Sequence, residues 1–244
     1  MEADTNPDSD IFQRAGLVLG TDVLAALGKA RVALFGVGGV GSWCAEGLVR
    51  TGVRHLTIVD SDRVVASNVN RQLMATSETI GELKVDALKR RLLAINPAAE
   101  IECRAERYDA ETAETFNLVD YDFVIDAIDS VDCKAQLIRH ALLHPSVTLF
   151  SSMGAARRLD PLRVRSAEFW KIQGDGLARA LRGRFRKSGD FPQRRFMCVY
   201  SDEPPASQGL GSIVQVTAVF GFALTSMVVS EVCHIFRRRA ENMV

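Results

Sequence analysis

Short apolar runs alternate with longer segments of helical periodicity along the first 150 residues of the chain. The runs predict buried β-strands, because they are short and rich in Val, Ile and Leu. We expect strands at residues 31–35, 55–60, 101–105, 123–127 and 147–150. We expect helices at residues 11–29, 42–51, 81–95, 110–118 and 131–143. This alternation is typical of βαβ units and predicts an α/β fold, a doubly wound, Rossmann-like, mostly parallel sheet with helices on both faces.

The spacing of the apolar runs changes after residue 155. We expect strands at 161–166 and 196–201, a helix at 177–187, a surface loop at 202–211 and a long apolar helix within 211–239. These elements form a C-terminal extension, residues 156–244, that completes the same domain as a core of residues 11–155. Residues 1–10 carry four acids and no base, and we expect them to form a flexible acidic tail.

Residues 213–233 form a mostly apolar stretch that is long enough to cross a bilayer as a helix. The stretch also contains polar residues, among them Gln215, Thr217 and Glu231. A helix packed into a core or a subunit interface accounts for both features. We therefore expect no stable membrane insertion.

The composition is that of an ordinary soluble domain. The chain has 244 residues, of which 47% are hydrophobic and 25% charged, and this excludes a wholly disordered chain. The 30 basic and 30 acidic residues give a net charge of zero. Binding of nucleic acid through overall charge is therefore excluded, and any basic site must be local.

The five cysteines are spread along the chain without a CxxC pair: Cys44, Cys103, Cys133, Cys198 and Cys233. Zinc modules usually show such pairs, so we expect no zinc site. The odd number of cysteines and the acidic first ten residues, which are unlike a secretory leader, indicate reduced thiols in a cytoplasmic protein.

A glycine-rich turn follows the first predicted strand. Gly36, Gly38 and Gly41 fit the pattern G-x-G-x-x-G, with Gly39 as an extra glycine. Such glycines permit a tight turn, close approach of a phosphate and close packing of the next helix, whose N-terminus attracts anions. Asp60 ends the second strand, where an acid can bind ribose hydroxyls. This order predicts a nucleotide site, and NAD, FAD, S-adenosylmethionine and ATP all use related turns.

The polar segment after Asp60 favours a triphosphate. It contains Asp62, Asn68 and Arg71, and Lys84 opens the next predicted helix. Two cations near one phosphate-binding turn suit ATP better than a dinucleotide, because a triphosphate carries more charge. The chain has no G-x-x-x-x-G-K-[ST] loop, so ATP must bind in another way. The alternative for both cations is a solvated surface position.

Two acids end the fourth predicted strand, at the edge where doubly wound sheets bind ligands. A carboxylate there can hold Mg²⁺ against phosphates. Asp129 is the candidate for this role, whereas Asp126 can instead cap the next helix.

Six motifs occur in order along residues 11–155: GVGGVGSWCAEGLVRTG, LTIVDSDRV, SNVNRQ, GELKVD, INP and DAIDS. The series resembles the adenylating domain of ubiquitin-activating enzymes and their bacterial ThiF/MoeB/HesA relatives. Within that superfamily, FQRAGLVLG, DAIDSVDCKAQLI, SSMGAARRLDP, CVYSDEPP and GSIVQVTAVFGF resemble the tRNA threonylcarbamoyladenosine dehydratase branch.

The resemblance implies an enzyme that uses Mg-ATP and a substrate carboxylate to form an acyl-adenylate and pyrophosphate. An internal nucleophile then closes a ring and releases AMP, which dehydrates the threonylcarbamoyl group of an adenosine beside the tRNA anticodon. It further implies a homodimer and a cysteine desulfurase or sulfur-acceptor system as a partner. The residues matched in this way are Gly36, Gly38, Gly39, Gly41, Asp60, Asp62, Asn68, Arg71 and Lys84 for the nucleotide, Asp129 for Mg²⁺, and Arg14 for the neighbouring subunit's site.

A basic segment at residues 177–195 indicates a contact with RNA. Its basic residues are Arg179, Arg182, Arg184, Arg186, Lys187, Arg194 and Arg195. Asp190 is the acid among them, and Phe185 and Phe191 lie in the same segment. Such a segment can contact RNA phosphates while bases stack on rings or guanidinium groups. A solvated charged helix is the alternative.

Two departures from the family patterns narrow the activity. Sulfur-carrier-activating members often carry two CxxC zinc pairs, which this chain lacks. Ubiquitin-type members carry a catalytic cysteine, whereas Cys198 lies in an apolar predicted strand and is expected to be buried. The alternatives are an adenylyltransferase for the C-terminal Gly of a ubiquitin-like sulfur carrier, a catalytically silent scaffold and an oxidoreductase; we expect no NAD.

Overall fold

The computed structural model describes residues 11–206 and 209–241, with side chains up to residue 238. The predicted acidic tail, residues 1–10, lies outside the described residues. The strands are β1 (Arg31–Phe35), β2 (His55–Val59), β3 (Glu100–Arg104), β4 (Phe123–Asp126), β5 (Thr148–Ser152), β6 (Val164–Glu168) and β7 (Met197–Ser201). The α-helices are α2 (Gln13–Leu19), α3 (Thr21–Lys29), α4 (Gly41–Arg50), α5 (Lys84–Ile95), α6 (Val131–Leu142), α7 (Gly176–Ser188) and α8 (Val214–Glu241).

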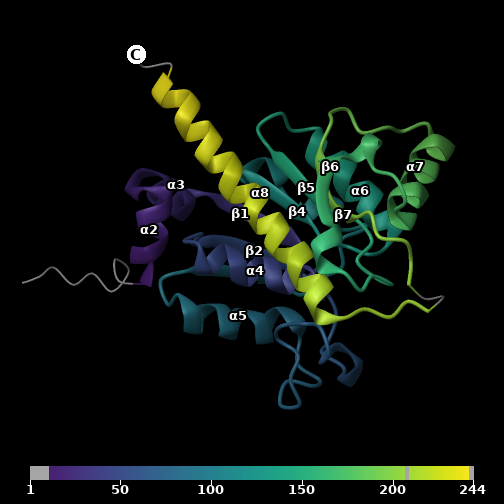
Figure 1. The fold of residues 1–244 in the computed structure, drawn as a ribbon, viewed down its shortest axis with the longest axis horizontal. Coiled ribbons are helices and arrows are strands. Elements are labelled where there is room, and N and C mark those ends of the chain that lie inside the picture. Colours follow the sequence, from purple (N-terminus) through teal and green to yellow (C-terminus); the bar gives the residue numbers. More distant parts are fainter. Residues whose placement is uncertain (1–10, 207–208, 242–244) are drawn as a thin grey trace, which may run out of the picture.

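The strands form one sheet in the order β3-β2-β1-β4-β5-β7-β6 (Figure 1). Neighbouring strands are parallel except for β6 and β7, which pair antiparallel at one edge. Phe35 at the end of β1 pairs with Val59 of β2 on one side and with Asp126 of β4 on the other. The strand order therefore reverses between β1 and β4, and doubly wound sheets bind ligands at such a point. This architecture confirms the predicted fold class.

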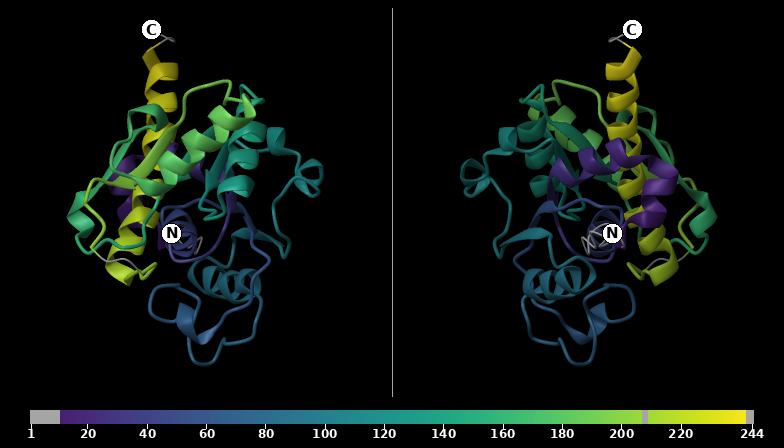
Figure 2. Two further views of the ribbon diagram at one scale, coloured as in Figure 1. Left: turned by 90° about the vertical axis from the view of Figure 1, so that its right-hand side faces the viewer. Right: turned by 90° about the vertical axis from the view of Figure 1, so that its left-hand side faces the viewer.

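The two faces of the sheet carry separate hydrophobic cores. Val32 and Leu34 of β1 pack on the face covered by α3, α4, α5 and α8. Ala33 and Phe35 pack on the opposite face, which α6 and α7 cover. Figures 1 and 2 show α8 crossing the sheet on the side away from α6 and α7. A strand buried on both faces requires apolar residues at successive positions, and this explains the continuous apolar runs in the sequence.

Helix α8 buries an apolar side chain at every fourth position from Val216 against the rest of the domain, and Thr217 and Thr225 beside this row are buried as well. The apolar residues are Val216, Phe220, Leu224, Val228 and Val232. Small residues let α8 cross α4 closely, because a Cβ added at Gly221 would lie 2.6 Å from the Val40 carbonyl oxygen. Residues 214–238 are long and apolar enough to cross a membrane, and half of their most apolar window is buried within the domain. The prediction of a packed core helix is therefore confirmed.

Two predicted helices differ in the structure. The helix expected at 11–29 is divided into α2 and α3 by Gly20, whose φ of 85° interrupts the helical backbone. The helix expected at 110–118 is wrong, because that segment forms two 3₁₀ turns, Ala113–Thr115 and Leu118–Asp120. Phe116 and Leu118 are both buried although they lie two positions apart, and one face of an α-helix cannot bury such a pair.

The strand expected at 161–166 begins later, at Val164. A 3₁₀ turn precedes it at Pro161–Arg163, where the Asp160 side chain accepts a hydrogen bond from the Leu162 backbone N–H. Proline at the first position of a turn and an N-capping aspartate favour this short helical start.

Candidate active site

A cavity of about 730 Å³ opens at the carboxyl ends of β1, β2, β4 and β5. We call the part lined by the segments after β1, β2 and β3 the glycine-turn half. The part lined by residues 152–158 and 175–177 is the distal half, and residues 210–217 pass beside the glycine turn, where Thr217 lies next to Gly39. The predicted site residues that line the cavity are Gly36, Gly38, Gly39, Asp60, Asp62, Arg71, Lys84 and Asp129. The predicted residues that lie outside its lining are Gly41, Asn68 and Arg14.

The glycine turn requires glycine at two positions for steric reasons. Gly36 has a φ of 86°, and a Cβ there would lie 2.7 Å from the Ala127 carbonyl oxygen. A Cβ at Gly41 would lie 1.9 Å from the Gly36 carbonyl oxygen. Gly41 therefore packs the start of α4 against the turn, while Gly38 and Gly39 expose backbone to the cavity.

Asp60 braces the glycine turn from the end of β2. Its Oδ2 accepts a hydrogen bond of 2.9 Å from the Val37 N–H, and its Oδ1 accepts one of 2.9 Å from the Asp62 N–H. Burial raises the pKa of Asp60, while the nearby Lys84 charge opposes that shift. Lys84 itself is buried, and its Nζ lies 2.6 Å from the Asp62 carboxylate. The turn, the acid and the lysine thus form one connected unit.

Asn68 and Arg71 have different positions although they are three residues apart. Asn68 is buried, and its Oδ1 accepts a hydrogen bond from the Val65 N–H, so its side chain shapes the local turn. Arg71 lines the cavity and donates to the Ser67 carbonyl oxygen and to the Asn70 side chain. Arg71, one of the two cations predicted for the phosphates, therefore lies at the cavity. The Asn68 side chain instead contacts the backbone of the turn that precedes Arg71.

The two acids at the end of β4 differ in how deeply their side chains are buried. Asp126 is fully buried, forms an ion pair with Lys134 at 2.8 Å and accepts a hydrogen bond of 2.7 Å from Ser151. Burial raises the pKa of Asp126, although the Lys134 charge and the Ser151 hydroxyl oppose the shift. Asp129 is exposed and lines the cavity. Of the two, Asp129 is the carboxylate that a ligand can reach.

The cavity is also lined by polar side chains that no sequence motif singled out. In the glycine-turn half they are Gln72, Arg107 and Tyr108, and in the distal half they are Arg157, Arg158 and Asp175. Cys133 also lines the cavity and lies 3.4 Å from an Arg107 nitrogen. The position of Arg157 and Arg158 after β5 is a usable signal, because the carboxyl ends of parallel strands carry ligand sites.

The basic segment divides into residues with structural partners and exposed residues. Arg182 donates to the Phe169 carbonyl oxygen, and Arg184 pairs with Asp132 at 2.6 Å. Arg194 donates to several carbonyl groups at and after the end of α6. In the part of the chain that the structure describes, four have exposed side chains without a hydrogen bond or ion pair: Arg179, Arg186, Lys187 and Arg195.

Two further predicted features concern cysteine and metal. Cys198 is buried in β7, and burial raises its pKa well above the ordinary value, so its thiol is poorly suited to act as a nucleophile. Among residues 11–206 and 209–238, no group of three or more His, Cys, Asp and Glu side chains could hold a metal ion.

Comparison with known proteins places this site in a family. The sequence profile of the ThiF family matches residues 12–243. The tRNA threonylcarbamoyladenosine dehydratase of Bacillus subtilis is 41% identical over 80% of this chain and 75% of its own length. The crystal structure of Escherichia coli tRNA N6-threonylcarbamoyladenosine dehydratase, TcdA, in complex with ATP has a TM-score of 0.90 at 30% identity, and covers 97% of this chain and 99% of that chain.

A more distant relative belongs to the alternative branch. The sulfur carrier protein adenylyltransferase of Thermus thermophilus is 34% identical over 52% of this chain and 47% of its own length. The dehydratases thus match more of the chain, including the elements that build the distal half. The chain belongs to the ThiF family.

Proposed function

We propose that the protein dehydrates N6-threonylcarbamoyladenosine in tRNA by an ATP-dependent route through an acyl-adenylate. The observation that carries this proposal is the two-part cavity at the switch point of the sheet. Its glycine-turn half carries the cations Arg71 and Lys84, and its distal half is open to a second substrate. The match of relatives named as dehydratases over most of the chain supports the same reaction.

The proposed reaction has two balanced steps. A carboxylate oxygen of the threonyl group bonds to the α-phosphorus of ATP, the bond to the β-phosphate oxygen breaks, and pyrophosphate leaves. A nucleophile within the threonylcarbamoyl group then attacks the acyl carbon, the bond to the AMP oxygen breaks, and AMP leaves. The proton lost by that nucleophile passes to water. The net change is removal of one water from the modified nucleoside.

The residues of the glycine-turn half fit ATP. Gly38 and Gly39 expose backbone to the cavity, and Arg71 and Lys84 supply positive charge for the phosphates. Gln72 Oε1 is buried, lines the same half and has no hydrogen-bond partner among the described residues. This atom offers an acceptor to the nucleotide. Asp60 holds the turn in shape for binding.

Mg²⁺ fits the site through Asp129. Mg²⁺ in nucleotide sites is usually held by one or two carboxylates together with phosphate oxygens and water, so a large protein cluster is not needed. Asp129 is the exposed carboxylate at the junction of the two halves. The ion would offset negative charge on the phosphates.

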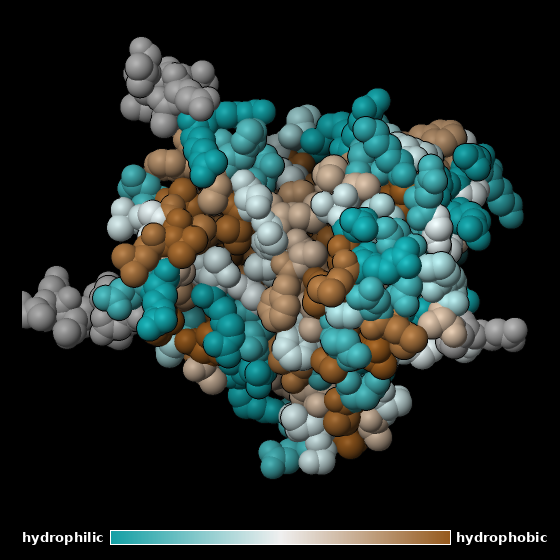
Figure 3. Space-filling model, in the orientation of Figure 1, coloured by the Kyte–Doolittle hydropathy of each residue, from teal (hydrophilic) through white to brown (hydrophobic). Residues whose placement is uncertain are grey.

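A homodimer accounts for the position of Arg14. Arg14 is exposed on α2, next to Leu17 and Val18, which are 83% and 84% exposed. Figure 3 shows hydrophobic side chains gathered over the α2–α3 region and the adjoining part of α8. A second copy of the chain would cover this apolar face and bring Arg14 to the neighbouring cavity.

The remaining partners follow from the same proposal. The exposed basic residues of α7 and its vicinity would contact tRNA phosphates, and a cytoplasmic location suits five free cysteines. The proposal includes a cysteine desulfurase or sulfur-acceptor system as a partner, and the site described above assigns it no residue.

The test is pyrophosphate release with three substrates. Transfer RNA that carries N6-threonylcarbamoyladenosine should stimulate release of pyrophosphate and AMP and lose one water in nucleoside mass analysis. The same tRNA without the modification should give no stimulation. Stimulation by a Gly-Gly-ended sulfur carrier instead of modified tRNA would overturn the proposal in favour of the adenylyltransferase.

A further inference from the structure

Arg158 is a buried guanidinium with unused hydrogen-bond donors. The residue is 4% exposed, and its Nε and Nη1 atoms have no hydrogen-bond partner among the described residues. Arginine stays charged at any physiological pH, so the group cannot avoid this state by losing a proton. A buried charge without hydrogen bonds is strongly unfavourable, which makes the pair of free donors a strong indication of a ligand.

The neighbouring acid does not satisfy Arg158. Asp175 Oδ2 lies 3.9 Å from Arg158 Nη2, which is beyond hydrogen-bond distance. Both Asp175 oxygens already accept backbone hydrogen bonds, one from Gly154 at 3.1 Å and one from Ala178 at 2.8 Å. Asp175 thus caps α7 and supplies nearby negative charge, but it leaves Nε and Nη1 of Arg158, a residue that lines the cavity, without a hydrogen bond.

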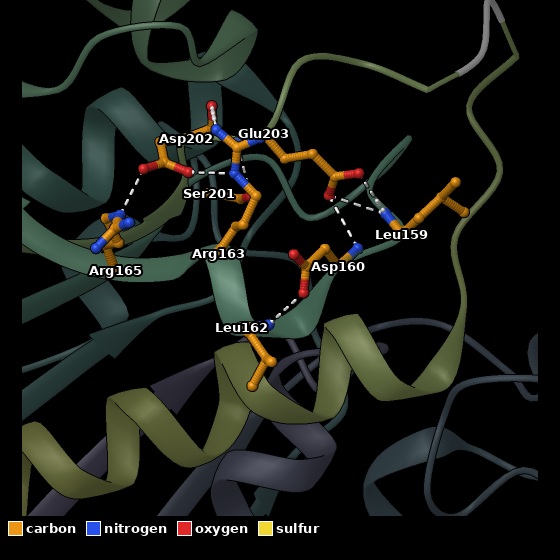
Figure 4. Close-up of polar contacts among 8 residues, drawn as sticks. All are labelled: Leu159, Asp160, Leu162, Arg163, Arg165, Ser201, Asp202 and Glu203. Carbon is orange, nitrogen blue, oxygen red and sulfur yellow. Dashed lines mark hydrogen bonds and ion pairs between the residues drawn. The ribbon is translucent and has the colours of Figure 1, made fainter.

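The backbone on both sides of Arg158 is fixed by contacts with distant segments. Arg157 has a φ of 63°, and its N–H and carbonyl oxygen bond to Gly211 and Ala206, each at 2.8 Å. The Glu203 carboxylate accepts hydrogen bonds from the Leu159 N–H at 2.9 Å and the Asp160 N–H at 3.0 Å. Figure 4 shows this carboxylate facing both amides, beside the Asp202 contacts with Arg163 and Arg165. The backbone that carries the Arg158 side chain is therefore held in place before a ligand arrives.

Arg158 lies in the distal half of the cavity, after β5, whereas the cations proposed for the ATP phosphates lie after β2. A planar guanidinium matches a carboxylate with two parallel hydrogen bonds, which Nη1 and Nη2 can donate along one edge, because Nη2 lies 3.9 Å from Asp175 and makes no hydrogen bond with it. We propose that Arg158 binds the threonyl carboxylate of the tRNA substrate, the group that attacks ATP, and that Glu203 is a positioning residue for it. This inference rests on the proposed function, because that function supplies a substrate carboxylate.

The test compares two RNA probes in the presence of α,β-methylene ATP, which prevents turnover. Both are anticodon stem-loop hairpins with N6-threonylcarbamoyladenosine, one with a free carboxylate and one with its methyl ester. The wild-type protein should bind the carboxylate probe at least about tenfold more tightly, as expected for a charge-assisted contact. Arg158→Gln should reduce that preference to within about twofold and leave ATP affinity unchanged.

Four further variants keep the result interpretable. Arg158→Lys keeps the charge but loses the planar fork, so it should fold and show a reduced preference even if Arg158→Gln is unstable. Glu203→Ala should reduce the preference more than Glu203→Gln, which retains one acceptor oxygen. Arg90→Gln is the control, because Arg90 is exposed on α5, pairs with Glu82 and lies outside the cavity lining.

Two outcomes would overturn the inference alone. The first is a wild-type preference that survives in both Arg158 variants, and the second is a loss of ATP affinity in those variants with the preference intact. The proposed function fails separately, and this inference with it, if the wild-type protein binds the carboxylate hairpin no better than an unmodified hairpin.

Discussion

The two halves of the cavity are held in shape by different means. In the glycine-turn half, the backbone itself fixes the geometry, because Gly36 and Gly41 leave no room for a side chain. In the distal half, side-chain carboxylates hold the chain: Glu203 binds the amides beside Arg158, and Asp175 binds Gly154. A site fixed by backbone contact tolerates few substitutions, whereas a site fixed by side chains can change its specificity with a single residue.

The largest expected effect is on the backbone-fixed half. Gly41→Ala places a Cβ 1.9 Å from the Gly36 carbonyl oxygen, so the turn or the start of α4 must move. We expect the free energy of unfolding to fall by about 3 kcal/mol or more, with loss of ATP binding. Denaturant unfolding and calorimetric titration with ATP measure both effects.

Gly39→Ala is the matched control in the same turn. Its Cβ would lie 3.4 Å from its nearest neighbours, which are side-chain atoms of Arg71 and Thr217. We expect unfolding free energy close to wild type. Equal stability of the Gly41→Ala and Gly39→Ala proteins would contradict the steric account of the turn.

The second prediction concerns the junction of the two halves. Asp129→Asn removes a charge that faces the cavity and keeps the side-chain shape. The rate of pyrophosphate release should fall about 10²–10³-fold, the usual loss for one electrostatic contact to a reacting group, with thermal stability unchanged. The rate is measured by quenching the reaction with modified tRNA at successive times and quantifying the released pyrophosphate.

Asp126→Asn, in contrast, should lower the stability of the protein. Asp126 is paired with Lys134 at 2.8 Å in a fully buried position, so its substitution leaves Lys134 as an uncompensated buried charge. Breaking such a pair typically lowers stability by about 3–5 kcal/mol.

A folded Asp129→Asn enzyme with near-normal pyrophosphate release would remove the metal-binding role from Asp129.

Much of the glycine-turn half could be predicted from the sequence, because its residues follow one another at short spacing. Asp60 and Lys84 were placed at the cavity by strand and helix positions alone. The distal half was not assigned residue by residue. The backbone next to Arg158 is held by Glu203, which lies more than 40 positions further along at the amides of Leu159 and Asp160, and no local pattern encodes that contact.

The same reasoning explains the wrong helix at 110–118. Its apolar residues suggested helical periodicity, but Phe116 packs edge-on against the Phe35 ring of β1, 5.3 Å between centroids. Tyr108 contacts Phe35 in the same way at 5.1 Å. This aromatic cluster, formed with a residue about 80 positions away, overrides local helix preference.

The third prediction concerns Arg14, which is proposed to complete the cavity of the neighbouring subunit. Arg14→Ala and Lys84→Ala proteins should each be inactive in pyrophosphate release. Mixed and re-equilibrated, they should recover about one quarter of wild-type activity, because half of the dimers are hybrids and each hybrid has one intact site. Native mass spectrometry confirms hybrid formation, and hybrids without recovered activity would exclude Arg14 from the neighbouring site.

The smallest expected effect is outside both halves, on the exposed basic residues around α7. The variant changes Arg179, Arg186, Lys187 and Arg195 to Ser, since the side chains of these four have no hydrogen bond or ion pair among the described residues. Affinity for tRNA should fall, and its salt dependence should flatten by about 0.7–0.9 per lost phosphate contact, the values for single strands and for duplex DNA. ATP affinity should stay within twofold, because the phosphate cations lie at the cavity.

The matched control for this variant changes Arg194 to Ser. It should lower thermal stability, because Arg194 binds carbonyl groups at the end of α6. It should leave the salt slope of tRNA binding unchanged. If the fourfold variant keeps both the tRNA affinity and the salt slope of the wild type, these residues are a solvated surface, and RNA recognition is confined to the distal half of the cavity.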